Sequence, residues 1–176
     1  ATKHYLASLP VCLGELKADL TQDILKLCVI DRHSGTAEMG KGFVTGFGIQ
    51  KGAVASTVAH DAHNLCVIGT NDEDMALAAN TLVSCGGGMV VVENGNVLAL
   101  NPLPIAGLMS EDPAVKVAKR VKAIEEAWQA LGCQIVSPFM TMALLSLGVI
   151  PELRLTNKGL IDTIHFKQIP LIDSQS

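Results

Sequence analysis

Apolar positions in this 176-residue chain fall mostly into short runs, each bounded by glycine or by polar residues. Residues 27–31 and 65–69 are two such runs, and both have the length of a buried strand. Two further runs, 89–93 and 97–100, flank the Asn-Gly pair at positions 94 and 95. Asn-Gly favours the two positive φ angles of a type I′ turn. The sequence therefore predicts two buried strands and a β-hairpin.

Helical periodicity appears in three places. Asn71 is a predicted N-cap, because acidic residues follow it in the first turn and an apolar face comes next, at Met75, Ala78, Ala79 and Leu82. A second helix is predicted between Asp112, as N-cap, and Gly132, with a core stripe at Val117, Val121, Ile124, Trp128 and Leu131. A third, apolar helix is predicted over residues 138–147.

The other segments predict irregular or extended structure. The first 25 residues give only short extended pieces, and the glycine-punctuated stretch 40–56 indicates bent strands or close backbone approach. Residues 153–156 and 163–167 are expected to be closing strands around a turn at 157–159. Strands joined by hairpins, with helices interspersed irregularly, predict an α+β domain with a mainly antiparallel sheet. We expect a single domain over residues 1–176, without a complete (β/α)₈ barrel, which needs roughly 200 to 250 residues.

Composition narrows the possible partners. Apolar residues make up 49% of the chain and charged residues 17%, so either the core is unusually large or much of the surface meets a partner. In the second case a homo-oligomer is expected. The net charge of −4 excludes nucleic-acid binding, since no cluster of basic residues is present to neutralise phosphates. No run of 18 apolar residues occurs, so no membrane partner is expected.

The five cysteines indicate a reducing compartment. They are odd in number and widely spaced, and no C-x-x-C pair occurs among them. Reduced thiols, and hence a cytoplasmic location, are the expected state. The chain opens without an initiator methionine, a basic segment or a long apolar segment, so it does not have the pattern of a signal peptide. We expect it to be part of a longer protein.

Candidate chemistry concentrates in the stretch "ASTVAHDAHN", where His60, Asp61, His63 and Asn64 follow a run of small and apolar residues. Imidazole and carboxylate groups suit Zn, Mn or Fe, although the two imidazoles could hold one ion only if a turn lies between them. The alternative is a polar loop in which Asp and Asn bond their own backbone.

Arg32 and His33 form a second polar pair, after the predicted strand at 27–31. Strand ends often carry functional side chains, so both residues are candidates for a site. A solvated surface turn explains the pair equally simply.

Six strings in this sequence resemble the C-terminal domain of bacterial-type adenine deaminase, a metal-dependent member of the amidohydrolase superfamily. The resemblance extends from about residue 22 to the end, in order and without large gaps, and residues 1–20 match less clearly. The strings are "DILKLCVIDRH", "GKGFVTGFGIQKGAVASTVAHDAHN", "VIGTNDEDMALAAN", "GGGMVVVENGNVLA", "LPIAGLMS" and "VIPELRLTNKGLID".

The resemblance implies a parent enzyme that hydrolyses adenine to hypoxanthine and ammonia in purine salvage. It further implies a divalent metal, manganese or iron, in that parent, on an upstream (β/α)₈ barrel introduced by an H-x-H motif. This sequence contains no H-x-H, so we expect the present chain to be inactive alone and to pack on the barrel as a partner.

The same resemblance makes Arg32, His33, His60, Asp61, His63 and Asn64 candidates for contact with substrate or metal, without individual roles. Ala62 stands where the family commonly has serine. Three hypotheses remain open: an accessory domain of the deaminase, a purely structural or oligomerisation module, and a free-standing metal hydrolase that uses His60, Asp61 and His63.

Overall fold

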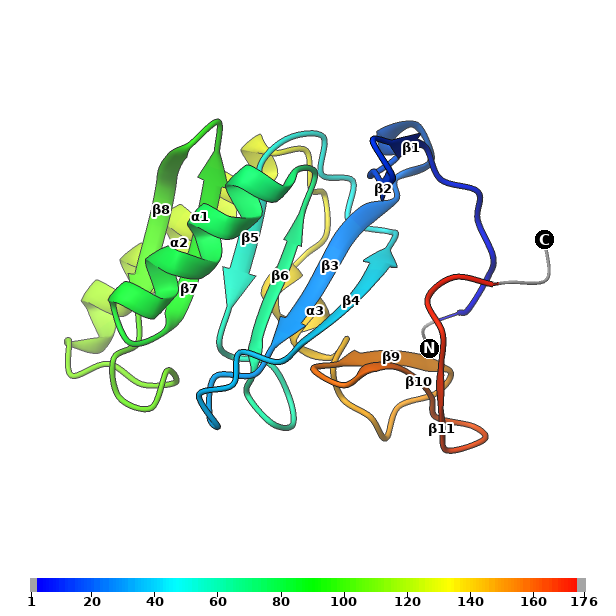
Figure 1. Ribbon diagram of the computed structural model, residues 1–176. Helices are drawn as coiled ribbons and strands as arrows, with labels where there is room; N and C mark the ends of the chain where they lie inside the picture. The colour runs from blue at the N-terminus through cyan, green and yellow to red at the C-terminus, as the bar shows by residue number, and fades with distance from the viewer. Residues whose placement is uncertain (1–2, 174–176) are drawn as a thin grey trace.

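A six-stranded antiparallel sheet forms the centre of the molecule (Figure 1). The structure is a computed structural model and describes residues 3–173. Neighbouring strands follow the order β4-β3-β6-β5-β7-β8, and every pairing is antiparallel. The strands are β3 (Leu25–Ile30), β4 (Met39–Val44), β5 (Ala53–Ser56), β6 (Leu65–Gly69), β7 (Gly88–Glu93) and β8 (Asn96–Pro102).

Helix α1 (Asp72–Ser84) covers one face of this sheet. The side chain of Asn71 accepts a hydrogen bond from the amide of Asp74 at 2.8 Å, so the predicted N-cap is confirmed. Three residues of the predicted apolar face are buried against β5, β6 and β7, namely Met75, Ala78 and Leu82. The helix ends before residues 85–88, where Gly86 has a φ of +80° that terminates the turn.

The predicted hairpin is also confirmed. Asn94 and Gly95 have φ angles of +50° and +73° and connect β7 to β8. The buried carboxylate of Asp74 accepts hydrogen bonds from the amides of Asn94 at 3.1 Å and Gly95 at 2.8 Å. A side chain in the first turn of α1 therefore fixes a turn twenty residues further along the chain.

Helices α2 (Ala114–Ala130) and α3 (Pro138–Ala143) lie on the other face. Trp128 is fully buried there and contacts Phe47 and Phe139. The predicted N-cap Asp112 is wrong by one residue: Pro113 holds that position, and the Asp112 carboxylate pairs with Lys116 and Arg120. Within the predicted core stripe Ile124, Trp128 and Leu131 are buried, whereas Val117 and Val121 are half-buried.

Helix α3 is shorter than predicted and ends at Ala143 rather than near residue 147. The backbone continues in turns, with the amides of Leu145 and Leu147 bonded to carbonyls three residues earlier. This tighter pattern terminates the α-helix although the sequence stays apolar.

A second sheet of three strands packs against β4 of the main sheet. Gly40 of β4 lies so close to the carbonyl oxygen of Thr156 that a β-carbon could not be accommodated, as the glycine pattern predicted. The strand expected at 163–167 is wrong in part: residues 163–166 form a turn, because the Asp162 carboxylate accepts bonds from the amides of Ile164 and His165. The strands are β9 (Leu153–Thr156), β10 (Gly159–Asp162) and β11 (Lys167–Ile169).

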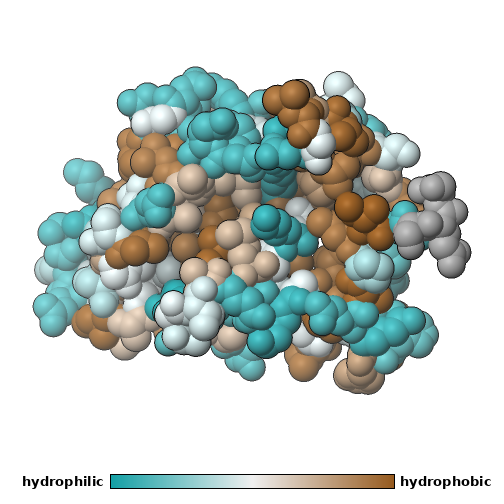
Figure 2. Space-filling view, in the orientation of Figure 1, coloured by the Kyte–Doolittle hydropathy of each residue, from teal (hydrophilic) through white to brown (hydrophobic). Residues whose placement is uncertain are grey.

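The N-terminal part consists of short extended pieces, as predicted: β1 (Val11–Cys12), β2 (Glu15–Leu16) and a 3₁₀ turn η1 (Leu20–Gln22). Its side chains contribute little to the core, and Leu6, Val11 and Leu13 are 74%, 66% and 99% exposed. Figure 2 shows hydrophobic side chains gathered at the upper right of the molecule, over β1 and β2.

The predicted fold class is therefore confirmed: the domain is α+β, with antiparallel sheets and few helices. Within residues 3–173 the strands close no barrel. None of the helices in this range is long and apolar enough to cross a membrane. All five cysteines are free thiols, and burial raises the pKa of the Cys66 thiol to about 12.

Candidate functional site

The two polar segments singled out from the sequence lie side by side. Strand β3 ends at Ile30 and strand β6 begins at Leu65, and these two residues are register partners in the antiparallel sheet. The segment that follows β3 is therefore placed against the segment that precedes β6. Arg32 and His33 thus meet the loop of residues 60–64, although sequence reasoning had treated the two as separate candidates.

A tight turn brings the two imidazoles of the loop together. The amide of His63 donates to the carbonyl oxygen of Ala59 at 2.7 Å, and His63 has a φ of +52°. Histidine tolerates this left-handed conformation better than most residues. The rings of His60 and His63 meet edge to face, with centroids 5.4 Å apart and planes inclined by 62°. The turn that the composition permitted is therefore present.

Side chains of the loop differ in their exposure. Asp61 faces solvent, His60 and His63 are half-buried, and Asn64 is 6% exposed. The Nδ1 atom of His63 and the Oδ1 atom of Asn64 are buried and have no hydrogen-bond partner among residues 3–173. Buried polar atoms are normally paired, so these two atoms are exceptions in the described part of the chain.

Arg32 holds the loop through its backbone. Its Nε atom donates to the carbonyl oxygen of His63 at 2.5 Å, and Nη2 donates to the carbonyl oxygen of Ala106 at 2.7 Å. The guanidinium lies against Gly107, where a β-carbon would come within 2.9 Å of its atoms. His33 adds a contact between its Nε2 atom and the carbonyl oxygen of Ala62 at 2.7 Å.

Two further contacts, which the sequence did not reveal, anchor the loop from the α3 side. The Ser146 hydroxyl donates to the carbonyl oxygen of His60 at 2.6 Å. The His60 amide donates to the carbonyl oxygen of Ala143 at 2.9 Å.

A third anchor reaches the loop from the C-terminal sheet. The Asn64 side-chain amide donates to Oδ1 of Asn157 at 3.2 Å, and Asn157 in turn donates to Glu38 at 2.9 Å. These partners lie far from the loop in sequence. Asn157 belongs to the string "VIPELRLTNKGLID", in which no residue pattern marks it as part of a site.

The surroundings of His63 keep its imidazole neutral. Burial lowers its pKa below the usual 6.5, and the positive charges of His60 and Arg32 lower it further, against a smaller opposing effect from Asp61. A neutral imidazole has one donor and one acceptor nitrogen. The lowered pKa favours this neutral form over the imidazolium.

The loop does not fit a hydrolytic metal centre. Within residues 3–173 no three side chains of His, Cys, Asp or Glu are grouped so that they could hold an ion. Protein zinc sites generally use three or four such ligands, and the loop brings together two imidazoles. No catalytic step through a metal on this chain follows from the geometry.

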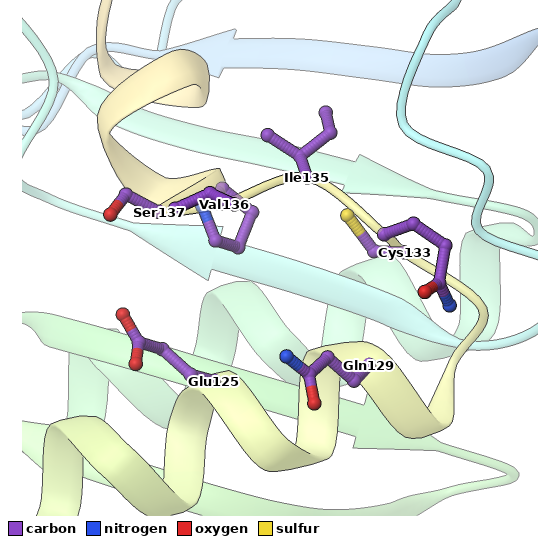
Figure 3. A pocket seen from close by; sticks show the side chains of 8 residues that line it. Glu125, Gln129, Cys133, Ile135, Val136 and Ser137 are labelled. Atoms are coloured by element: carbon purple, nitrogen blue, oxygen red, sulfur yellow. The ribbon is translucent and has the colours of Figure 1, made fainter.

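A pocket of about 240 Å³ lies elsewhere, between the second half of α2 and the segment 133–138 (Figure 3). Glu125 and Gln129 line it from the helix, and Cys133, Ile135 and Ser137 line it from the facing segment. None of the six candidate residues lines this pocket. The candidate site therefore lies outside this pocket.

Comparison with known proteins agrees with the resemblance seen in the sequence. Residues 1–167 match the family described as adenine deaminase C-terminal domain. The chain belongs to this family. It is 60% identical over 171 residues to the adenine deaminase of Moorella thermoacetica, a match that covers 97% of the chain and 29% of the relative. The adenine deaminase of Clostridium botulinum, strain Loch Maree, is 60% identical over 157 residues, with coverages of 89% and 26%.

A less similar relative is covered to about the same extent. The adenine deaminase of Dehalococcoides mccartyi is 43% identical over 169 residues, which are 96% of the chain and 30% of the relative. The chain thus spans less than a third of the length of these relatives. It is a C-terminal domain.

Proposed function

We propose that this domain acts as an accessory part of an adenine deaminase, an enzyme that hydrolyses adenine to hypoxanthine and ammonia in cytoplasmic purine salvage. The metal of that enzyme, manganese or iron, is held by an upstream barrel, and the domain is inactive without it. In this proposal the domain packs on the barrel and presents the loop of residues 60–64 to its active site.

The observation that carries the proposal is the convergence of Arg32, His33, His60 and His63 on one surface. Two separate segments, Arg32-His33 and the one with Ser146, bond to backbone carbonyl oxygens of this loop, so these bonds do not use the imidazole rings of His60 and His63. A neutral imidazole at His63 suits contact with a purine or with a proton in transfer.

Exposed apolar side chains support the packing of the domain on a preceding segment. Leu6, Val11 and Leu13 lie near the N-terminal hairpin and are mostly exposed. Apolar groups gathered on a surface commonly mark a contact with another part of a protein. The family relatives are more than three times as long as the chain, so a large preceding part is present to cover them.

A structural or oligomerisation role is the second candidate. The same backbone contacts that position the loop also tie β3, β6, α3 and the C-terminal sheet together. In that case the histidines contribute to stability alone.

Replacing His60 by alanine and His63 by asparagine, which tolerates the φ of +52° at this position, separates the two candidates when each change is made singly in the full-length deaminase that contains this domain. An accessory catalytic role predicts a loss of kcat/KM with an unchanged melting temperature, because the backbone contacts remain. A purely structural role predicts an unchanged kcat/KM and a lower melting temperature. His165→Ala is the matched control, since His165 is exposed in the β10–β11 turn and lies outside the loop.

A second experiment addresses the activity of the domain itself. The 176-residue chain, supplied with manganese and adenine, is expected to release no ammonia, whereas the full-length enzyme does. Turnover by the isolated chain would contradict the accessory role.

A further inference from the structure

Four loops project from one end of the main sheet, called here the site end, which is the lower end in Figure 1. Strands β3, β5 and β8 end there, and strands β4, β6 and β7 begin there. The loops are therefore residues 31–38, 57–64, 85–87 and 103–113. Register partners at this end are Ile30 with Leu65, Ser56 with Met89, and Gly88 with Pro102. Two of the four loops contain the candidate residues of the site.

The loop of residues 103–109 presents two apolar side chains at the site end. Its sequence is "LPIAGLM", without a charged residue. The amides of Ile105 and Met109 each donate to the carbonyl oxygen of the other at 3.1 Å, so the two residues are directly opposed as in an antiparallel ladder. Side chains of such a pair lie on the same side. Ile105 and Met109, called here the apolar pair, are 38% and 56% exposed.

Buried contacts fix this loop to the sheet. The Thr57 hydroxyl donates to the carbonyl oxygen of Gly107 at 2.6 Å and accepts from the amide of Gly88 at 2.8 Å. A β-carbon on Gly87 would lie 2.5 Å from the α-carbon of Gly107, so the two backbones are in close contact. The exposure of the apolar pair therefore belongs to a loop held in place by buried bonds rather than to a frayed one.

Arg32 joins the apolar pair to the histidine loop. Its guanidinium donates to the carbonyl oxygen of His63 at 2.5 Å and to that of Ala106 at 2.7 Å. The loops 60–64 and 103–109 are therefore neighbours on either side of one arginine. Exposed apolar side chains surrounded by polar groups are typical of a surface that contacts another part of a protein.

The part of the enzyme that precedes this domain joins it close to the site end. The His4 amide donates to the carboxylate of Glu152 at 3.2 Å, which places the start of the described chain beside the beginning of β9. Strand β9 has 4 residues, about 13 Å, and the turn after it holds Asn157, which bonds Asn64 of the histidine loop at 3.2 Å. The chain thus enters the domain roughly one short strand away from the site end.

We propose that the site end of this domain docks on the preceding part of the same polypeptide, with Ile105 and Met109 as the apolar anchor of the contact. The relatives extend beyond the matched region for more than two thirds of their length, so the preceding part is large enough to cover the four loops. The surface opposite the apolar pair is expected to be apolar as well. This inference rests on the proposed function, in which the domain packs on an upstream barrel.

Hydroxyl-radical labelling of the full-length enzyme, read by mass spectrometry, tests whether the apolar pair is covered. Val97 is the matched control, because it is aliphatic, 43% exposed and located at the other end of β8. For each residue the labelling in the native enzyme is divided by that in the denatured enzyme. The ratio for Ile105 is expected to be at least about fivefold lower than the ratio for Val97, because a residue at the centre of a contact is shielded from solvent. Equal ratios overturn the proposal.

A charge in the apolar pair tests its role as the anchor. Met109→Lys in the full-length enzyme is expected to raise the labelling ratio of Ile105 to that of Val97, since an unpaired charge is not tolerated inside an apolar contact. Val97→Lys is the control and leaves Ile105 protected. Ile105 that stays protected in the Met109→Lys enzyme overturns the role of the pair.

Photo-crosslinking identifies what covers the pair. Ile105→p-benzoylphenylalanine in the full-length enzyme is expected to link, under ultraviolet light, to a peptide that precedes this domain, while the denatured product keeps the mass of one chain. A product of doubled mass, which would show a second copy on this surface, overturns the proposal, as do links found only within residues 1–176.

Failure of the docking is distinguishable from failure of the proposed function. If Ile105 is protected while His60→Ala and His63→Asn keep full kcat/KM, the docking stands and the histidines have no part in catalysis. If Ile105 is labelled like Val97, the docking is wrong whatever the histidine variants do.

Discussion

The Nε atom of Arg32 donates to the backbone carbonyl oxygen of His63 over 2.5 Å and joins two loops that are 31 residues apart in sequence. A second donor of the same guanidinium reaches Ala106 at 2.7 Å. Because the donors of arginine form a rigid fork, both acceptors are held in one fixed geometry. Arg32 is therefore a positioning residue for His63, and its own charge need not touch any ligand.

Arg32→Lys keeps the charge and loses the fork. We expect the free energy of unfolding to fall by about 1–2 kcal/mol, because one of the two carbonyl oxygens loses its donor. Hydrogen exchange is expected to accelerate at the amide of His63, which closes the turn onto Ala59. Arg120→Lys is the matched control: Arg120 binds the side chain of Asp112 on α2, so its replacement leaves exchange in the loop unchanged.

Gly107→Ala tests the contact between Gly107 and the Arg32 guanidinium. A β-carbon at this position would come within 2.9 Å of the Arg32 guanidinium, at a backbone φ of +74°. Gly95→Ala is the control, since its φ is +73° and no atom lies within 4 Å of the added carbon. Both substitutions carry the cost of the left-handed backbone, about 1 kcal/mol.

The difference between the two melting temperatures then reports the clash with Arg32. We expect Gly107→Ala to be the more destabilising, and Arg32→Ala to reduce that excess when the two are combined. Equal losses at Gly107 and Gly95 would show that the guanidinium does not rest on Gly107.

The pKa of His63 predicts a pH dependence. Burial, then the positive charges of His60 and Arg32, hold the folded pKa below 6.5, so the unfolded chain binds more protons as the pH falls. The free energy of unfolding should accordingly decrease below about pH 6.5 and level off below the folded pKa.

Titration by nuclear magnetic resonance measures the pKa of His63 directly. The imidazole of His63 should titrate below its usual range, and His60→Asn should raise its pKa by removing a neighbouring positive charge. Asparagine tolerates the positive φ, so His63→Asn keeps the turn. In this variant the free energy of unfolding should decrease less below about pH 6.5 than in the wild type. A His63 imidazole that titrates at or above 6.5 would contradict the expected burial.

The elements predicted correctly from the sequence are those with signals inside a few neighbouring residues. Asn71 with its acidic first turn specifies the start of α1, and Asn94-Gly95 specifies the hairpin, because both depend on local backbone geometry. The strand expected at 163–167 was wrong because a local signal there was missed: Asp162 bonds the following amides and makes a turn.

The site could be predicted only as separate pieces. The sequence indicated Arg32 and His33 at one strand end and residues 60–64 near another, but their meeting depends on the pairing of β3 with β6, which no local pattern specifies. The anchors Ala106, Ser146 and Asn157 contribute through backbone contacts and ordinary amide or hydroxyl groups. Such groups occur throughout any sequence, so their role becomes visible only in three dimensions.

Asp74 is the clearest case of a single side chain that joins two predicted elements. Its side chain is 3% exposed, and it accepts bonds from Asn71, Asn94 and Gly95. Burial alone would raise its pKa, but the bonds from Gly95, Asn71 and Asn94 outweigh this effect and hold the pKa below 3.8. The carboxylate is therefore ionised in the folded domain, and its stabilising effect is present above pH 3.8 and lost as the pH falls through the folded pKa.

Asp74→Ala should lower the free energy of unfolding by about 2–3 kcal/mol, because two turn amides and the N-cap side chain lose a charged acceptor. Asp74→Asn keeps one acceptor oxygen and should cost less. Glu73→Ala, in the same first turn but exposed, changes only a weak interaction with the helix dipole and should cost below about 1 kcal/mol. Urea denaturation of the three variants measures the series, and an Asp74→Ala variant as stable as Glu73→Ala would mean that the hairpin turn holds its shape without α1.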